Sequence, residues 1–191
     1  MVEPIPNRIV LLPLRKSIPL MVRNRLLEGL SEAFGLPVIV ARPAPPPALA
    51  WDPQRDQYLG PRLLAFLADL AFPDALRLLG VLDADAYAPG LNFCFGQAVL
   101  NGREAFIALA RLSHAQYFDQ LPVRPEIFAE RALKEALHEL GHTFGLQHCQ
   151  HACVMRFSNS LLEADEKPAG FCPTCRTVLH EAVKRAVASE S

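Results

Sequence analysis

The chain has 191 residues, of which 51% are hydrophobic and 20% charged, and its formal net charge is −1. This composition predicts one globular unit with a real core and a smaller appendage. The near-neutral charge argues against nucleic acid as the main partner, because phosphate binding needs a pronounced basic surface. The longest N-terminal apolar run, residues 9–14, is too short for a signal core or a membrane span. We therefore expect a cytoplasmic protein with reduced thiols and no membrane partner, and we treat it as a monomer.

The first part of the chain alternates strand and helix patterns. Arg8–Leu14 predicts a strand, Pro19–Phe34 a helix with apolar residues near helical spacing, and Pro37–Ala41 a second strand. This order suggests a parallel crossover unit. Pro43–Pro47 contains four prolines and predicts an extended connection. Pro61–Leu70 predicts another helix, because Pro61 suits the first turn.

The middle of the chain predicts further strands. Leu78–Leu82 and Ala105–Leu112 are candidate buried strands, and Asn92–Leu100 is a candidate edge strand between them. That edge either binds an extended peptide through its backbone or only covers the core as a hairpin arm. Asp83 and Asp85 precede it, and we interpret them as solvated loop acids rather than a metal site.

Two more helices are expected in the C-terminal half. One begins near Pro125 and carries an inward apolar stripe. On the same helix Arg131 and Glu135 have the spacing of a solvated salt bridge. The other helix, Pro173–Ser189, closes the chain.

Residues 138–148 read His-Glu-Leu-Gly-His-Thr-Phe-Gly-Leu-Gln-His. On a helix, His138 and His142 differ by only about 40° in azimuth and can reach one ion. A continuing helix would turn His148 away from that ion, so the helix must end between His142 and His148. Gly145 is the place where it can end, because glycine adopts the left-handed conformation without a Cβ clash.

Glu139 has a different role from the histidines. It lies about 100° from their face, so its carboxylate suits a metal-bound water rather than the metal. The alternative for the short His-Glu-x-x-His pattern is the polar face of an ordinary helix, but the extended spacing favours a hydrolytic zinc site. Met155 is the only methionine after this helix and is the one candidate for a methionine turn under the metal.

A second cluster follows directly. Its members, spaced C-x3-C and C-x2-C, are Cys149, Cys153, Cys172 and Cys175. Paired thiolates of this kind typically hold a structural zinc. The alternatives are two disulfides or four unrelated buried thiols. His151 could replace a thiolate, but an exposed loop histidine is the simpler interpretation. We interpret Cys94 as a small buried side chain.

The run from His138 to Cys175, with Cys149 adjoining His148, resembles the archaemetzincin family of metzincin-like metallopeptidases. Weaker similarity lies in residues 54–58, 91–98 and 165–168. The resemblance implies two zinc ions: a catalytic one on His138, His142 and His148, and a structural one on Cys149, Cys153, Cys172 and Cys175. It further implies Glu139 as general base, Met155 in the methionine turn, and an edge strand that holds a peptide above the zinc. The candidate substrate-binding residues there are Asn92, Phe93, Cys94, Phe95 and Gly96.

We therefore predict an α/β, zincin-like fold with a mixed twisted sheet, a backing helix and an active-site helix. A small zinc-stapled C-terminal subdomain ending in a helix completes it, with the division at residues 1–145 and 146–191. The predicted function is zinc-dependent hydrolysis of peptides or proteins, and the resemblance allows an aminopeptidase. A zinc-stabilised binding module with little or no activity is the alternative, and a nucleic-acid adaptor is disfavoured by charge. For a second oxyanion donor the candidates are Tyr87, His114 and Tyr117.

Overall fold

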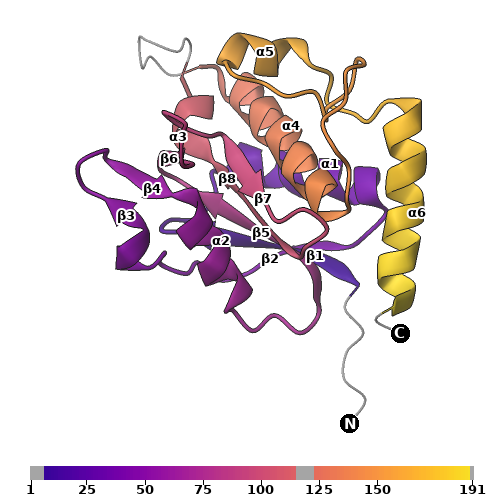
Figure 1. The fold of residues 1–191 in the computed structure, drawn as a ribbon, viewed down its shortest axis with the longest axis horizontal. Helices are drawn as coiled ribbons and strands as arrows, with labels where there is room; N and C mark the ends of the chain where they lie inside the picture. Colours follow the sequence, from indigo (N-terminus) through magenta and orange to yellow (C-terminus); the bar gives the residue numbers. More distant parts are fainter. Residues whose placement is uncertain (1–6, 115–122, 190–191) are drawn as a thin grey trace.

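The computed structural model describes residues 7–114 and 123–189, and its centre is a five-stranded mixed sheet (Figure 1). The strand order is β2-β1-β5-β8-β7. The strands are β1 (Arg8–Leu14), β2 (Val38–Val40), β5 (Ala75–Leu82), β7 (Gly96–Ala98) and β8 (Glu104–Ala108). Neighbours pair in parallel except β7, which runs antiparallel to β8 at the edge. The predicted α/β class with a mixed sheet is confirmed.

The first crossover has the predicted form. Helix α1 (Leu20–Phe34) follows Pro19 and ends at Gly35, whose φ of +65° is left-handed. It connects β1 to β2, and these two strands pair in parallel. The proline-rich segment after β2 forms no helix or strand, and its one ladder contact is a bridge between Leu14 and Ala44.

A smaller three-stranded sheet was not predicted. It contains β3 (Trp51–Asp52), β4 (Gln57–Leu59) and β6 (Ala86–Tyr87), preceded by a short 3-10 helix, Ala48–Ala50. Strands of two or three residues carry too little alternation to be recognised in a sequence. Helix α2 (Gly60–Ala68) follows β4 and corresponds to the predicted second helix, with Pro61 in its first turn.

Helices cover both faces of the main sheet (Figure 1). Along β1, Ile9 and Leu11 join the core that contains α1 and α4 (Pro125–Thr143), whereas Val10 and Leu12 join the core that contains α2. This alternation is the period-two pattern of a strand buried on both faces. Helix α4 packs on the face of the sheet that carries Ile9 and Leu11, next to strands β8 and β7.

Two strand predictions need correction. The predicted strand 105–112 ends at Ala108, and residues Leu109–Leu112 form the short helix α3. An apolar run does not distinguish a buried strand from a buried helical turn, which explains the error. The expected edge strand 92–100 is reduced to β7, and the segment before it is irregular except for a bridge between Ala86 and Cys94.

The C-terminal part contains the predicted last helix, α6 (Pro173–Ser189), and a short helix that was not predicted, α5 (Leu161–Glu166). One core cluster contains Phe34 and Leu140 together with Met155, Phe171 and Val183, so it crosses the expected boundary at residue 145. The two-part division remains a proposal. Within the described ranges no helix has the length and apolarity needed to cross a bilayer.

Candidate functional site

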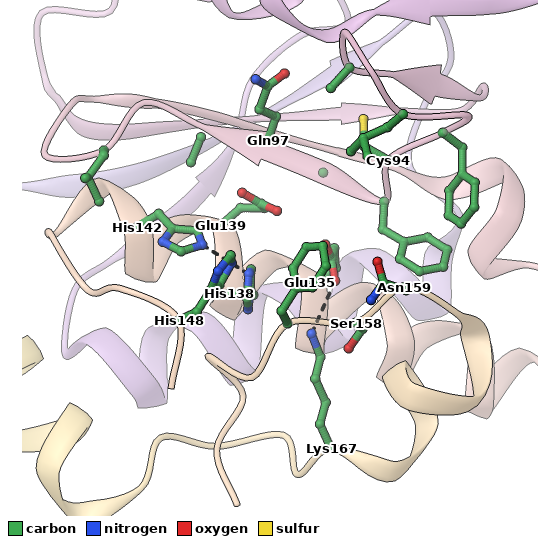
Figure 2. Close-up of a pocket in the computed structure, with 18 of the residues that line it drawn as sticks. Cys94, Gln97, Glu135, His138, Glu139, His142, His148, Ser158, Asn159 and Lys167 are labelled. Carbon is green, nitrogen blue, oxygen red and sulfur yellow. Dashed lines mark hydrogen bonds and ion pairs between the residues drawn. The ribbon is translucent and has the colours of Figure 1, made fainter. Parts of the chain in front are cut away.

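Three imidazoles converge beside the C-terminal half of α4 (Figure 2). One ring nitrogen from each of His138, His142 and His148 lies within 4.8 Å of the others, and the Nε2 atoms of His138 and His142 are 3.1 Å apart. Two nitrogens bound to a tetrahedral zinc at about 2.0–2.1 Å would lie about 3.3 Å apart. The first two rings therefore already have nearly the spacing of zinc ligands.

The helix ends where the spacing of the histidines requires it to end. The α-helical residues stop at Thr143, and Gly145 has a φ of +87°. Its N–H donates to the carbonyl of His142 (2.9 Å), and the N–H of Leu146 donates to that of Gly141 (3.1 Å). These bonds satisfy the last carbonyls of the helix and reverse the chain, which brings His148 back to the other two rings.

Backbone carbonyls orient the two helical histidines. Nδ1 of His138 lies 2.9 Å from the oxygen of Val154, and Nδ1 of His142 lies 2.7 Å from that of Leu146. A carbonyl can only accept, so each Nδ1 carries the hydrogen and each Nε2 keeps a lone pair for a metal. Burial lowers the pKa of His138 to about 4 and also lowers those of His142 and His148. All three are thus neutral near pH 7, the form that binds metal.

Glu139 lies beneath the edge of the sheet. It is 5% exposed, and a Cβ added to Gly96 would stand 2.7 Å from its Cγ. Only a glycine in β7 permits this approach. Burial, followed by the neighbouring carboxylate of Glu135, raises the pKa of Glu139 well above its usual value, so the carboxylate is a strong proton acceptor in this site.

Met155 packs under the helix at Gly141. Its side chain is fully buried, and a Cβ on Gly141 would stand 2.5 Å from its sulfur. The preceding residue, Val154, supplies the carbonyl that orients His138. The turn containing Met155 is therefore placed to support the histidine site, as the expected methionine turn would be.

A cavity of about 480 Å³ opens beside the histidines and is lined by all five candidate substrate-binding residues. Cys94 is half-buried there, and burial strongly raises the pKa of its thiol. Glu135, which the sequence analysis treated only as a salt-bridge residue, also lines the cavity. So do residues that sequence reasoning did not single out; among them are Phe157, Ser158, Asn159 and Lys167. The only sequence signal for any of these was the 165–168 similarity, which includes Lys167.

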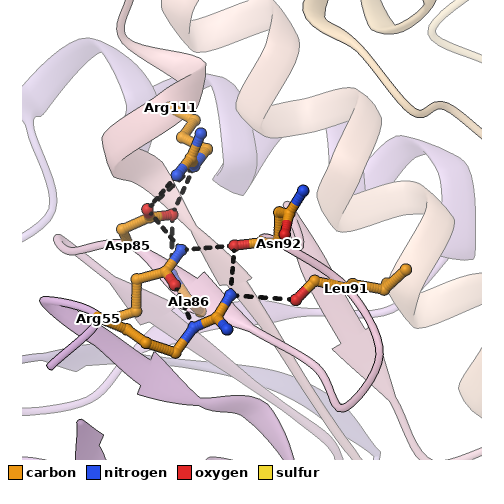
Figure 3. A network of polar contacts seen from close by, with 7 residues as sticks. Arg55, Asp85, Ala86, Leu91, Asn92 and Arg111 are labelled. Atoms are coloured by element: carbon orange, nitrogen blue, oxygen red, sulfur yellow. Dashed lines mark hydrogen bonds and ion pairs between the residues drawn. The ribbon is translucent and has the colours of Figure 1, made fainter.

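A polar network fixes the rim of this cavity (Figure 3). Arg55 and Gln57 each donate to the backbone oxygen of Asn92, at 3.0 Å. Gln57 also donates to Asp85 (2.9 Å), whose carboxylate binds the guanidinium of Arg111 through both oxygens. Residues in or beside the short elements β4, β6 and α3, which the sequence did not predict, thus hold the segment that leads into β7.

The two acids before the edge strand are less exposed than predicted. The side chains of Asp83 and Asp85 are 19% and 20% exposed, and each has basic partners. Lys16 Nζ lies 3.6 Å from Asp83, and Arg111 binds Asp85. They are structural ion pairs rather than solvated loop acids.

The predicted Arg131–Glu135 salt bridge is wrong. Arg131 is 4% exposed and binds both carboxylate oxygens of Asp165 at 2.7 Å. Glu135 is paired instead with Lys167, whose Nζ lies 3.5 Å from its Oε2. Lys134 donates to the carbonyl of Asp165 (2.7 Å). Because segment 164–167 covers this side of α4, the helix residues bind partners from that segment instead of each other.

The four cysteine thiols form a second cluster, and their sulfurs lie within 4.8 Å of one another. All are free, and Cys149 and Cys172 have sulfurs 3.8 Å apart, far longer than a disulfide. Two sulfurs on a tetrahedral zinc at about 2.3 Å would lie about 3.8 Å apart. The disulfide alternative is therefore wrong, and His151 is exposed outside the cluster.

The thiols differ in acidity. A hydrogen bond from the Cys175 backbone lowers the pKa of Cys172 to about 7, whereas burial raises those of Cys153 and Cys175. One thiolate is therefore readily formed near neutral pH. Binding a metal would release the remaining protons.

Two of the three candidate oxyanion donors, Tyr87 and His114, are not brought to the site. Tyr87 donates its hydroxyl to Asp52 (2.9 Å), and neither Tyr87 nor His114 lines the cavity. Tyr117 lies outside the described residues.

Sequence comparison with known proteins identifies archaemetzincins as relatives. The sequence model described as peptidase family M54 matches residues 51–181. The archaemetzincin of Methanopyrus kandleri is 43% identical over 171 residues, covering 88% of this chain and 93% of that protein. The archaemetzincin of Archaeoglobus fulgidus is 37% identical, covering 82% and 92%.

Solved structures give the same result for the fold. The crystal structure of archaemetzincin from Methanopyrus kandleri superposes with a TM-score of 0.82 at 42% identity, covering 94% of this chain and 97% of that one. A zinc-dependent peptidase from Methanocorpusculum labreanum gives 0.75 at 28% identity, covering 89% and 99%.

Proposed function

Because this chain belongs to peptidase family M54, the archaemetzincins, and is a zinc metallopeptidase, we propose that it cleaves peptide bonds with Glu139 as general base. We further propose two zinc ions. The catalytic one is held by His138, His142 and His148, and the structural one by Cys149, Cys153, Cys172 and Cys175. The observation that carries the proposal is a buried carboxylate in one cavity with three neutral imidazoles, two of which are oriented by backbone carbonyls.

Both donor sets fit the ion assigned to them. Three nitrogens leave a position for water, as catalytic zinc sites do, whereas four thiolates close the coordination sphere, as structural sites do. When bound to the histidines, zinc would polarise the scissile carbonyl and lower the pKa of its water toward about 7.

Glu139 performs the proton transfers. Burial raises the pKa of Glu139, so its ionised carboxylate is basic enough to accept the proton of the attacking water, and the carboxylic acid that results later donates this proton to the leaving amine. Gly96 excludes any side chain between this carboxylate and the sheet edge. A peptide lying along that edge therefore has its backbone close to the base.

The backbone of β7 offers hydrogen-bonding groups to that peptide. The N–H of Val99 donates to Glu104, and the carbonyl of Phe95 accepts from Ala108, so these groups face β8. In an antiparallel ladder the direction alternates along the strand, which turns the N–H and C=O groups of Gly96 and Ala98 toward the unpaired edge. An extended peptide can add to the sheet there.

The finer features of the proposal follow from the same site. The resemblance to the family allows an aminopeptidase, which removes residues from the amino end of a peptide. We also propose that the protein is a cytoplasmic monomer in which the thiols stay reduced. The alternative, a binding module without useful hydrolysis, has no need of a base at Glu139. Comparing peptides with free and acetylated amino termini decides between aminopeptidase and internal cleavage.

The test is the Glu139→Gln variant in the zinc-loaded protein, assayed on a mixed peptide library by mass spectrometry. We expect the variant to keep its zinc, measured by metal analysis, and to lose at least about a thousandfold in turnover. Glu130→Gln, on the same helix but half-exposed, is the matched control and should keep full activity. Full activity in Glu139→Gln would remove that residue from the mechanism, and an inactive wild type with zinc bound would favour the binding module.

A further inference from the structure

One end of the cavity has polar groups that hydrolysis does not use. Around the Glu135–Lys167 pair, this end is lined by Ser158 and Asn159 (Figure 2). The ring of Phe157, which also lines the cavity, has its centroid 5.0 Å from that of the His148 ring. The cavity is also lined by Phe93 and Phe95, whose ring centroids are 5.1 Å apart. Aromatic walls with a polar end suit a side chain that has an apolar stem and a hydrogen-bonding tip.

The polar end has spare hydrogen-bonding capacity. The side chain of Lys167 is 1% exposed, and the one side-chain partner that the described structure gives its ammonium is Glu135, at 3.5 Å. An ammonium has three donors. The hydroxyl of Ser158 is inaccessible to solvent and has no hydrogen-bond partner among the described residues. Buried donors without acceptors are costly, so these groups indicate a ligand that brings an acceptor.

The charges at this end restrict the ligand to an uncharged one. Glu135 and Lys167 together form a neutral pair. A carboxylate entering the site would be repelled by Glu135, and an ammonium by Lys167. An apolar tip would leave the donors of Lys167 and Ser158 unpaired. A carboxamide avoids all three penalties, because its oxygen accepts from Lys167 and from the hydroxyl of Ser158 while its NH2 group donates to Glu135.

The direction of the sheet edge fixes which substrate residue reaches this end. The edge lies over Glu139 at Gly96 and over the end of α4 at Asn101, whose N–H donates to His142 (3.1 Å). Glu135 precedes Glu139 by one turn, so it lies on the opposite side of the base. A peptide pairing antiparallel to β7 runs from the His142 side to the Glu135 side. The residue that follows the scissile bond therefore meets this end.

We propose that Lys167, Glu135 and Ser158 form a specificity subsite for the carboxamide side chain of Gln or Asn, placed immediately after the scissile bond. This inference rests on the proposed peptidase function and names its substrate class.

The test uses peptides of sequence acetyl-Ala-Ala-X-Ala-Ala-amide, with X as Gln, Glu, Met or Lys. Alanine fills the other positions, so the side chain at X alone decides which peptide bond lies at the catalytic site. Binding is measured by calorimetry with the zinc-loaded Glu139→Gln protein, and cleavage is measured with the zinc-loaded wild type. We expect the Gln peptide to bind at least tenfold more tightly than each of the other three. We also expect cleavage immediately before X.

Two sets of variants assign any preference to the subsite. Ser158→Ala removes a single hydroxyl and should reduce the Gln-over-Met preference severalfold. The paired change Glu135→Gln with Lys167→Met avoids leaving one buried charge alone, and it should reduce the preference to less than twofold.

The outcomes separate this inference from the proposed function. Selective binding of the Gln peptide, without cleavage of it or of the same peptide with a free amino terminus, would support the subsite and count against the peptidase. Cleavage of all four peptides at similar rates would support the peptidase and overturn the subsite. A Gln preference that persists unchanged in both sets of variants, or no binding of any peptide, would also overturn the subsite.

Discussion

The histidine triad ends at His148 and the thiol cluster begins at the next residue, Cys149, but the fold prepares the two sites differently. Two imidazoles share one helix and are oriented by carbonyls, and the helix itself packs against the sheet and α1. The thiols come from a segment without regular structure and from the start of α6. We infer that packing pre-organises the first site, whereas the second site needs the zinc ion proposed for it to become fully ordered.

The largest effect should come from removing one thiol of the cluster. Cys153→Ser replaces a fully buried ligand with a weak one, and zinc binding at such a site contributes directly to folding. We expect the free energy of unfolding to fall by more than about 4 kcal/mol in urea denaturation, with one zinc lost. Cys94→Ser, outside the cluster, should change it by less than about 1 kcal/mol. A stable Cys153→Ser protein would show that the two sites are equally supported by packing.

A smaller effect tests what holds segment 164–167 on the active-site helix. Asp165→Asn leaves the buried guanidinium of Arg131 without its counter-ion, which should cost about 3 kcal/mol of unfolding free energy. The matched change is Glu130→Gln, which removes a half-exposed partner of Arg25 and should cost less than about 1 kcal/mol. Both are measured by urea denaturation of the zinc-loaded protein. Equal losses of unfolding free energy in the two variants would show that the burial of Arg131 does not strengthen its pairing with Asp165.

The pre-organised histidine site should make the metal-free protein sensitive to acid. The pKa of His138 is about 4 in the folded chain and near 6.5 when unfolded, so between these values the unfolded state binds more protons. Stability therefore rises with pH in this window and is lost as pH falls from about 6.5 to 4, by up to about 3 kcal/mol. Urea denaturation in the presence of a chelator measures the slope. His138→Gln should flatten it, and an unchanged slope would assign the acid sensitivity to other groups.

The smallest effect tests the packing under the triad. Gly141→Ala places a methyl group 2.5 Å from the sulfur of the buried Met155, which should cost about 2 kcal/mol of unfolding free energy by overpacking. Adding Met155→Ala opens the space, so the double variant should be destabilised by less than the sum of the single ones. Met155→Leu keeps the volume and should cost less than about 1.5 kcal/mol. Additive costs in the double variant would show that the two residues do not press on each other.

The sequence predicted what depends on local spacing. His138 and His142 follow from helical geometry, Gly145 from the need to end the helix, and the four thiols from their paired spacing. The parallel crossover of β1, α1 and β2 was likewise visible in hydrophobic periodicity.

Features that depend on distant segments were missed or wrong. Arg131 and Glu135 have the spacing of a helical ion pair, but only the folded chain shows that α5 and Lys167 take them as partners. The small sheet that fixes the cavity rim was missed because its strands have only two or three residues. The hydrogen bond from Gln57 to Asn92 forms only in the folded chain. The sequence also gave no indication that Lys167 is buried beside the cavity, because lysine is usually exposed.

The missing side chain at Gly96 has a consequence for how the enzyme would choose where to cut. Every residue of an extended peptide presents the same main-chain groups to the strand, and side chains return to the same face after two residues. A substrate sliding by two positions would therefore offer a new bond to Glu139 with equal alignment. Where no Gln or Asn fills the proposed subsite and fixes the register, such an enzyme would trim a flexible tail at several neighbouring bonds instead of making one defined incision.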